Sequence, residues 1–194
     1  FCAGAGGKTL ALGAMMRNTG RLYALDTGAG RLAALAPRLL RAGLTSVYPM
    51  ALAHERDERL QRLAGKADRV LVDAPCSGLG TLRRSPDLKW RQSPQAVREM
   101  AAKQAAILAA AAALVRPGGG RLVYATCSVL TDENEDIATG FDRQHPDFVR
   151  TPAADALRAG GVPAAEALVD GDALRLWPHR HGCDGYFAAV WQRR

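Results

Sequence analysis

The chain has 194 residues, of which 48% are hydrophobic, and its 26 Lys and Arg against 19 Asp and Glu give a formal net charge of +7. One well-cored domain accounts for this length and composition. The longest apolar run, residues 105–115, is shorter than the roughly 20 residues of a membrane helix, which argues against a membrane protein. The basic excess favours a polyanionic partner such as nucleic acid, although an uninvolved basic surface fits the charge equally well.

Hydrophobic runs of strand length alternate with helical patterns, which predicts βαβ units and a parallel sheet with helices on both faces. In the first third, the expected elements are a helix after Lys8 to about Asn18, a strand at 21–26, a helix at about 31–41, a strand at 46–48 and a polar helix at 54–63. The chain begins abruptly at Phe1, with no room for the strand expected before its glycine-rich stretch, so we expect that a preceding segment exists or was lost.

The remaining elements continue the alternation. Ser93 is expected to cap a helix with Pro94 in its first position, and the acids at 132, 133, 135 and 136 are expected in a first helical turn, where the helix dipole favours negative charge. Residues 151–170 lack a clear period and are expected to be irregular. The full list is a strand at 68–75, a helix from Ser93 to 117–118, a strand at 121–128, a helix after Thr131, and an antiparallel pair at 174–178 and 185–191.

The stretch "CAGAGGKT", residues 2–9, is typical of a loop that brings backbone close to a ligand at a helix N-terminus. It is not a P-loop, since Cys2 stands where that motif needs glycine, and Thr9 breaks the dinucleotide pattern. Asp26 follows Gly7 by 19 residues, at the end of the next strand, where an acid can bind two ribose hydroxyls. A nucleoside-bearing ligand is therefore predicted, although other α/β proteins carry both features for other ligands.

Two cysteines are predicted to end neighbouring strands. Asp73 and Cys76 follow one strand and Cys127 follows the next, so both thiols are expected in the crevice beyond the carboxyl ends of a parallel sheet. A single cysteine there is more often a buried apolar filler, but polar neighbours such as Ser77 and Ser128 weigh against that interpretation. The four cysteines of the chain contain no CxxC pair, which excludes a zinc knuckle and a disulfide framework and favours a reducing cytoplasm.

Five segments occur in the order seen in one enzyme family: "CAGAGGKT", "LD" at 25–26, "DAPCSGLGTLRRSPDLKW", "YATCSVLTDENE" and "PHRHGCDGYFAAV". The chain resembles the RNA cytosine-5 methyltransferases of the NOL1/NOP2/Sun family, specifically the bacterial Sun-like rRNA enzymes. The resemblance implies S-adenosylmethionine bound to a Rossmann-like α/β fold, whose mostly parallel sheet has a C-terminal antiparallel strand pair and whose first strand is largely missing here. It further implies one catalytic domain over residues 1–194, an additional N-terminal RNA-binding region in the parent protein, and an RNA substrate, with ribosomal RNA favoured over transfer RNA. We expect no metal and assume a monomer.

The resemblance also implies roles for individual residues. Cys127 would be the nucleophile that adds to cytosine C6, Cys76 would assist release of the product, and Asp73 and Lys8 would stabilise the charged ring. The alternative, that Cys76 attacks, stays open because DNA cytosine-5 methyltransferases place their nucleophile in a Pro-Cys pair. The implied cofactor contacts are Cys2, Ala3, Gly4, Ala5, Gly6, Gly7, Lys8, Asp26, Arg31, Asp73 and Pro75. The implied RNA contacts are Arg83, Arg84, Lys89, Trp90 and Arg91, with Trp90 either stacking on RNA or packing in the core.

The region "VYPMALAHERDE" departs from the family, which usually has an acid there that contacts the adenine; Glu55 or Asp57 are possible substitutes. Zinc at His179, His181 and Cys183 is disfavoured, because three ligands within five residues cannot easily surround one ion. Two other classes remain as alternatives. One is an RNA-binding module with weak or no catalysis. The other, a methyltransferase for proteins or small molecules, has no need for two strand-end thiols.

Overall fold

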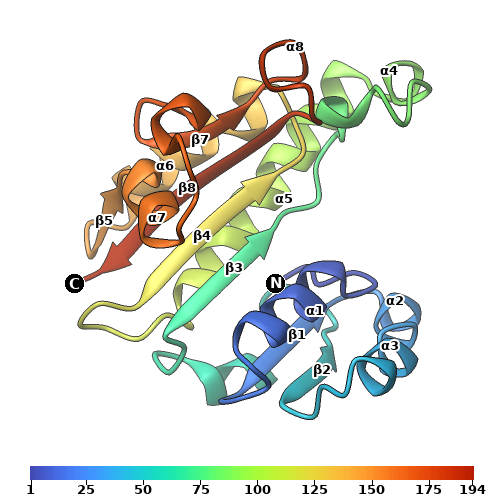
Figure 1. The fold of residues 1–194 in the computed structure, drawn as a ribbon, viewed down its shortest axis with the longest axis vertical. Coiled ribbons are helices and arrows are strands. Elements are labelled where there is room, and N and C mark those ends of the chain that lie inside the picture. The colour runs from blue at the N-terminus through green and yellow to red at the C-terminus, as the bar shows by residue number, and fades with distance from the viewer. The chain divides into compact units, whose positions relative to one another are not determined.

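Two separate sheets organise the computed structural model, which describes residues 1–194 (Figure 1). The chain divides into Phe1–Arg59, here unit 1, and Leu60–Arg194, here unit 2. No helix in either unit combines the length and hydropathy that a membrane span requires.

Unit 1 is a parallel two-stranded sheet with short helices. Its strands pair in register from Leu22↔Val47 to Asp26↔Ala51. Buried apolar residues of α2, α3 and both strands, among them Leu32 and Leu39, form its core. Its elements are α1 (Gly7–Met15), β1 (Leu22–Asp26), α2 (Ala29–Ala33), α3 (Ala36–Arg41) and β2 (Val47–Ala51), and the 3₁₀ helix η1 (Glu58–Leu63) begins at its end.

Three predictions for unit 1 need correction. The first helix ends at Met15 rather than near Asn18, because Arg17 and Asn18 adopt left-handed backbone conformations. The single helix predicted at 31–41 is broken into α2 and α3, since Pro37 has no backbone N–H to continue the helical hydrogen bonds. The polar helix predicted at 54–63 is only the 3₁₀ helix η1, because residues 53–57 form a turn around Asp57.

Unit 2 contains a six-stranded sheet with the order β3-β4-β8-β7-β6, and β5 also pairs with β8. Strands β3 and β4 are parallel, whereas β8 runs antiparallel to β4, β5 and β7. In Figure 1, α5 lies behind β3 and β4, and α7 lies in front of the sheet. The strands are β3 (Arg69–Asp73), β4 (Arg121–Thr126), β5 (Phe148–Thr151), β6 (Val169–Asp170), β7 (Ala173–Leu176) and β8 (Tyr186–Arg193).

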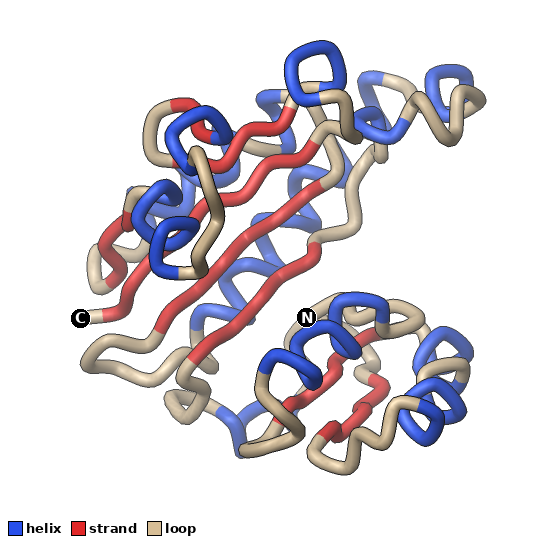
Figure 2. The backbone as a smooth tube through the Cα atoms, in the orientation of Figure 1, coloured by secondary structure: helices blue, strands red, loops and turns tan.

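The helices of unit 2 connect these strands, as the tube in Figure 2 makes plain. The α-helices are α4 (Leu88–Arg91), α5 (Pro94–Ala112), α6 (Glu135–Gln144), α7 (Ala153–Ala159) and α8 (Pro178–His181); the 3₁₀ helices are η2 (Leu79–Thr81), η3 (Thr131–Glu133) and η4 (Ala165–Leu168). The predicted cap of α5 is confirmed, because the Ser93 hydroxyl accepts a hydrogen bond from the Ala96 N–H at 3.1 Å.

Helix α5 ends at Ala112, earlier than predicted, because the following residues leave the helix to pair with the segment before β3: Ala67 N–H donates to Leu114 O and Arg116 N–H to Ala67 O, each at 2.9 Å. The antiparallel pair predicted near the C-terminus is confirmed as β7 and β8. The irregular connection predicted at 151–170 is wrong, since it contains α7 and η4. Ala153 and Ala165 are almost fully buried there, and small residues of this kind pack closely without a visible hydrophobic period.

Candidate active site

The two predicted strand-end thiols meet at one edge of the unit 2 sheet. Strands β3 and β4 are parallel and pair Asp73 with Ala125, so both chains leave the sheet at the same edge. The Ala74 N–H donates to Ala125 O at 2.9 Å and holds the two exits together. Cys76 Sγ and Cys127 Sγ lie 3.3 Å apart, and both residues are half-buried. The predicted juxtaposition of these thiols is confirmed.

The contact between the sulfurs changes the acidity of one of them. The hydrogen bond with Cys127 raises the pKa of the Cys76 thiol above its usual value, and burial raises it further. Cys76 therefore keeps its proton at neutral pH and can donate it in a hydrogen bond to the Cys127 sulfur. Negative charge on Cys127 would be stabilised by this donor.

Behind the Cys76 loop lies a buried carboxylate that sequence analysis assigned to a helix dipole. Glu133 has no exposed surface. It accepts hydrogen bonds from Ser77 N–H at 2.7 Å, Ser77 Oγ at 2.5 Å and Gln104 Nε2 at 3.1 Å. Gln104 also donates to Pro75 O at 2.8 Å. Glu133 does lie in the first turn of a helix, the 3₁₀ helix η3, but its contacts give it another role: this acid holds the loop that carries Cys76.

The next residue, Asn134, is also fully buried and holds the other loop. Its side-chain oxygen accepts a hydrogen bond from Thr126 Oγ1 at 2.5 Å, and its Nδ2 donates to Ser128 O at 3.1 Å. Thr126 and Ser128 flank Cys127. Sequence reasoning missed Glu133, Asn134 and Gln104 as site residues, because a run of acids after a strand is typical of an exposed helix start.

A third loop reaches Cys127 through Gly80. The Gly80 N–H donates to Cys127 O at 2.9 Å, and Gly80 O accepts from the Gly185 N–H at 2.8 Å. A Cβ added at Gly80 would lie 2.3 Å from Gly185 O and 2.7 Å from Cys127 O. Only glycine allows the backbone of η2 to approach Cys127 this closely.

The glycine loop of unit 1 opens α1 as predicted. It is held by the Ala3 N–H, which donates to Leu25 O at 3.0 Å, and by Arg38 Nη1, which donates to Ala5 O at 2.6 Å. A Cβ added at Gly4 or Gly7 would meet no atom within 4 Å, so this loop is open beside both glycines. The open backbone at a helix N-terminus suits the close approach of a ligand.

Asp26 lies beneath the glycine loop and is 4% exposed. It accepts from Gly4 N–H at 2.7 Å, Gly28 N–H at 2.6 Å and Arg31 Nη2 at 2.6 Å. Burial by itself would raise the pKa of this carboxyl, but the hydrogen bonds from Gly28, Gly4 and Arg31 outweigh it and lower the pKa. These three bonds leave about one of the four acceptor positions of a carboxylate. For Asp26 to accept hydrogen bonds from two ribose hydroxyls, Arg31 would thus have to move.

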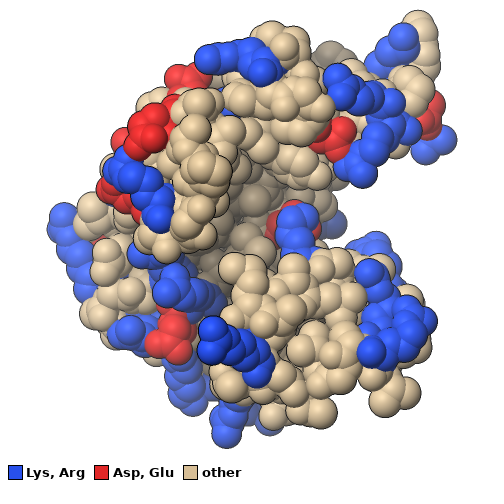
Figure 3. All heavy atoms as spheres, viewed as in Figure 1, with Lys and Arg blue, Asp and Glu red and all other residues tan.

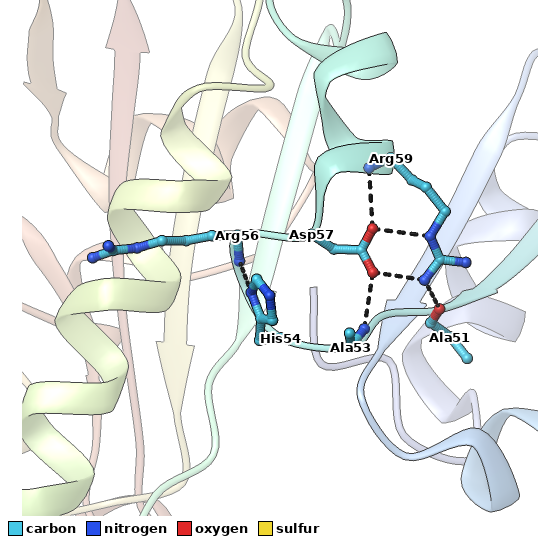
Figure 4. A network of polar contacts seen from close by, with 6 residues as sticks. All are labelled: Ala51, Ala53, His54, Arg56, Asp57 and Arg59. Atoms are coloured by element: carbon cyan, nitrogen blue, oxygen red, sulfur yellow. Dashed lines mark hydrogen bonds and ion pairs between the residues drawn. The ribbon is translucent and has the colours of Figure 1, made fainter.

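Asp57, one of the substitutes considered for an adenine contact, is used to build the turn after β2 (Figure 4). It accepts from the Ala53 N–H at 2.9 Å and from the backbone and guanidinium of Arg59 at 2.6 to 3.0 Å. The side-chain hydrogen bond from Arg59 is the main cause that lowers the pKa of Asp57. These bonds fill the acceptor positions of Asp57. The other substitute considered, Glu55, is half-buried.

Two further side chains are predicted to be catalytic. Lys8 is exposed on α1 of unit 1, and Asp73 is half-buried at the end of β3 in unit 2.

Basic side chains gather over the segment around α4 at the upper right of Figure 3. Arg83 Nη1 donates to Gly182 O at 2.9 Å, and Arg84 forms an ion pair with Asp184. Trp90 is 81% exposed, which corrects the alternative of a core position, and Lys89 Nζ lies 4.9 Å from its ring centroid. The Arg91 guanidinium lies 2.8 Å from the Asp87 carboxylate. This exposed arrangement can contact a polyanion.

The histidines and cysteine of the turn before β8 have structural contacts. His181 Nδ1 accepts from the Trp177 N–H at 2.8 Å, and its Nε2 lies 3.0 Å from Ala167 O. The Cys183 thiol donates to Asp184 O at 3.2 Å. These contacts fasten the turn.

Comparisons with known proteins decide the family. The family model described as 16S rRNA methyltransferase RsmB/F matches residues 1–192. The chain belongs to this family. The resemblance to the NOL1/NOP2/Sun methyltransferases is thereby confirmed.

Individual proteins of the RsmB/F kind agree with this. The chain is 38% identical over 188 residues to the probable ribosomal RNA small subunit methyltransferase B of Synechocystis sp., which covers 97% of this chain and 41% of that protein. The crystal structure of PH0851 superposes with a TM-score of 0.86 at 35% identity, covering 99% of this chain and 41% of that one. For the crystal structure of NSun6 from Pyrococcus horikoshii with SFG, the TM-score is 0.80 at 26% identity. That match covers 98% of this chain and 46% of the NSun6 chain. The chain thus spans less than half the length of these relatives. The Rossmann-like methyltransferase fold is confirmed.

Proposed function

We propose that this RsmB/F family protein methylates C5 of a cytosine in RNA, with S-adenosylmethionine as methyl donor and a transient bond between Cys127 and C6. The observation that carries the proposal is the pair of thiols, 3.3 Å apart, at the carboxyl ends of adjacent parallel strands. A methyltransferase for proteins or small molecules has no use for such a pair. The names of the relatives favour ribosomal RNA as the substrate.

The chemistry of cytosine explains why thiols are needed. C5 is too weakly nucleophilic to attack a methyl group, so the Cys127 sulfur first forms a bond to C6 and pushes electron density onto C5. In this proposal Asp73 and Lys8 stabilise the charge that develops near N3 and the exocyclic amine. After C5 has been methylated, a base removes the C5 proton, and the electron pair re-forms the C5–C6 double bond as the S–C6 bond breaks. Cys76 assists this release.

The residues proposed to hold S-adenosylmethionine fit that group in part. The open backbone at Gly4 and Gly7 and the ionised Asp26, with its remaining acceptor position, suit a charged nucleoside. Once bound, S-adenosylmethionine supplies an electrophilic methyl group. The chain's part is to bind and orient it through the implied contacts, which are residues 2–8, Asp26, Arg31, Asp73 and Pro75.

The RNA would bind through the basic segment around α4. Its phosphate contacts would orient the RNA without selecting a sequence, and exposed Trp90 offers a stacking surface. The target base must leave its stack to reach Cys127. The proposed RNA contacts in this segment are Arg83, Arg84, Lys89, Trp90 and Arg91. In this proposal residues 1–194 form the catalytic domain of a cytoplasmic protein.

Separate replacement of the two thiols tests the proposal. Cys76→Ala should accumulate a protein–RNA adduct that survives denaturing electrophoresis, because the bond forms and cannot break. Cys127→Ala should form none, and Cys183→Ala, which alters a thiol at a turn, should turn over normally. An adduct in Cys127→Ala and none in Cys76→Ala would assign the attack to Cys76 instead.

The second candidate, an RNA-binding module, predicts a different result. Calorimetric titration with S-adenosylmethionine would then give no heat of binding, while RNA would still bind. Binding of the methyl donor together with an adduct in Cys76→Ala excludes the module.

A further inference from the structure

The two thiol-bearing loops are fastened to two consecutive buried residues. Ser77 directly follows Cys76, and its N–H and hydroxyl both donate to the Glu133 carboxylate, at 2.7 and 2.5 Å. On the other side, the Asn134 side chain bonds to Thr126 Oγ1 at 2.5 Å and to Ser128 O at 3.1 Å. The residue after Cys76 and both neighbours of Cys127 are thus bonded to the Glu133–Asn134 pair.

The two loops are also tied to each other. Ser77 Oγ and Ser128 Oγ lie 3.3 Å apart. Because the single proton of the Ser77 hydroxyl is donated to Glu133, Ser128 must be the donor in this contact. The Ser128 oxygen in turn accepts from the Leu130 N–H at 3.1 Å. The hydrogen bonds around Ser77 and Ser128 therefore have one consistent direction, which favours a single arrangement of the two loops.

The nature of Glu133 indicates a purpose beyond packing. Its carboxylate has no exposed surface, and its three hydrogen-bond donors, on Ser77 and Gln104, are all neutral. Burying a carboxylate without a cation is costly. Apolar residues would pack the same space at lower cost but would leave the position of Ser77, and hence of Cys76, unspecified.

We propose that Glu133 and Asn134 are positioning residues that hold the Cys76 and Cys127 sulfurs at the separation which the reaction requires. This inference rests on the proposed function, in which one sulfur bonds to C6 and the other serves the release at C5 of the same base. Adjacent ring carbons can be reached from two sulfurs only if the sulfurs stay close together. The Gln104 side chain supports the same geometry, because it bonds to both Glu133 and Pro75 O.

The separation can be measured without RNA or methyl donor by using phenylarsine oxide. This reagent closes a ring with two neighbouring thiols, forming two As–S bonds and releasing one water, and it binds single thiols much more weakly. The unmodified protein should take up one equivalent at Cys76 and Cys127, as mass spectrometry of digested protein would locate it. Two variants disturb the network. Glu133→Gln keeps the shape of the side chain but replaces one acceptor oxygen by an NH₂ group, which can only donate. Ser77→Ala removes a single hydroxyl.

Both variants should bind phenylarsine oxide about tenfold more weakly or worse. Their kcat for RNA methylation should fall about 10- to 100-fold, with KM for RNA and for S-adenosylmethionine within about twofold, because neither residue contacts substrate. The matched control is Asp142→Asn, which makes the same carboxylate-to-amide change at another partly buried site of unit 2. Its side-chain oxygen can still accept the 2.6 Å hydrogen bond from Trp191 Nε1, but the ion pair with Arg150 is lost. This control should retain arsenical binding and kcat.

Unchanged arsenical binding in folded Ser77→Ala and Glu133→Gln would overturn the proposal, as would an equal loss in Asp142→Asn. Should Glu133→Gln fail to fold, Ser77→Ala decides alone. If the unmodified protein binds the arsenical but methylates no RNA, the proposed function fails while the positioning of the two sulfurs stands.

Discussion

At the scale of single residues, the contact between the Cys76 and Cys127 sulfurs determines how firmly Cys76 holds its proton. The hydrogen bond with Cys127 is the largest cause of its raised pKa, ahead of burial. A thiol with a raised pKa is a poor nucleophile at neutral pH but a lasting hydrogen-bond donor. The proposed roles, attack by Cys127 and assistance by Cys76, agree with this raised pKa.

The first prediction concerns this pKa. Alkylation by iodoacetamide follows the thiolate fraction, so in the unmodified protein Cys76 should react slowly until the pH exceeds the ordinary thiol value of about 8.5. Cys127→Ala removes the main cause of the shift, and the midpoint of the Cys76 pH–rate curve should move to lower pH. Peptide mass spectrometry over a pH series measures it.

Cys183 in the same samples is the control, because its curve should not move. Greater access to Cys76 would raise its rate at every pH, whereas a lowered pKa displaces the midpoint. A midpoint that stays in place would contradict the assigned cause.

Residue patterns predicted the thiols but not what positions them. The strand-end placement of Cys76 and Cys127 follows from apolar runs of strand length, because parallel strands bring their carboxyl ends to one edge. The burial of Glu133 could not be predicted in this way. Its partner Ser77 lies 56 positions earlier in the chain, and a local charge pattern carries no information about so distant a donor.

At the scale of elements, Gly80 joins three segments: η2, the end of β4 and the turn before β8. Its N–H bonds to Cys127 O and its carbonyl accepts from Gly185. The antiparallel pairing of β7 and β8 was predictable from two apolar runs on either side of a polar turn. The closeness of that turn to Gly80 was not, since it depends on β8 pairing with β4, a strand about 60 residues earlier.

The second prediction uses this junction. Gly80→Ala would place a methyl group 2.3 Å from Gly185 O and 2.7 Å from Cys127 O, and both are backbone atoms that cannot turn aside. We expect a loss of about 2 to 4 kcal/mol in the free energy of unfolding, comparable to a severe packing defect, together with weaker arsenical capture by Cys76 and Cys127. Urea unfolding and phenylarsine oxide titration are the measurements.

Gly140→Ala is the matched control. Gly140 lies within helix α6, where an added Cβ meets nothing within 4 Å. Alanine there should raise stability by about 0.5 to 1 kcal/mol through its helix propensity. Equal effects of the two substitutions would show that close approach at Gly80 is not the cause.

At the scale of the whole molecule, the net charge of +7 and the exposed segment around α4 lead to a prediction about RNA binding. The affinity should fall with salt, because each phosphate contact releases counterions. Lys89→Gln should make the plot of log affinity against log salt less steep, reducing the magnitude of its negative slope by about 1. Trp90→Ala should leave the slope unchanged but weaken binding by about 1 to 3 kcal/mol through lost stacking.

Fluorescence anisotropy with a labelled RNA at several salt concentrations separates the two effects. The melting temperature of Trp90→Ala should stay the same, since the side chain is 81% exposed. Leu40→Ala, an 83% exposed position on α3, serves as the control and should bind RNA normally. A Trp90→Ala variant with unaltered affinity would remove Trp90 from the RNA surface.

The last strand has a consequence for the protein while it is being made. β8 borders β4, β5 and β7, so β4 lacks a neighbour on one side until Arg193 has emerged from the ribosome. By then Cys76 and Cys127 have long since left the ribosome, but the sheet at whose edge both thiols lie is still incomplete. The capacity of the Cys76 and Cys127 pair to bind the arsenical should accordingly arise late, when translation of this segment is complete, rather than grow gradually as the chain lengthens.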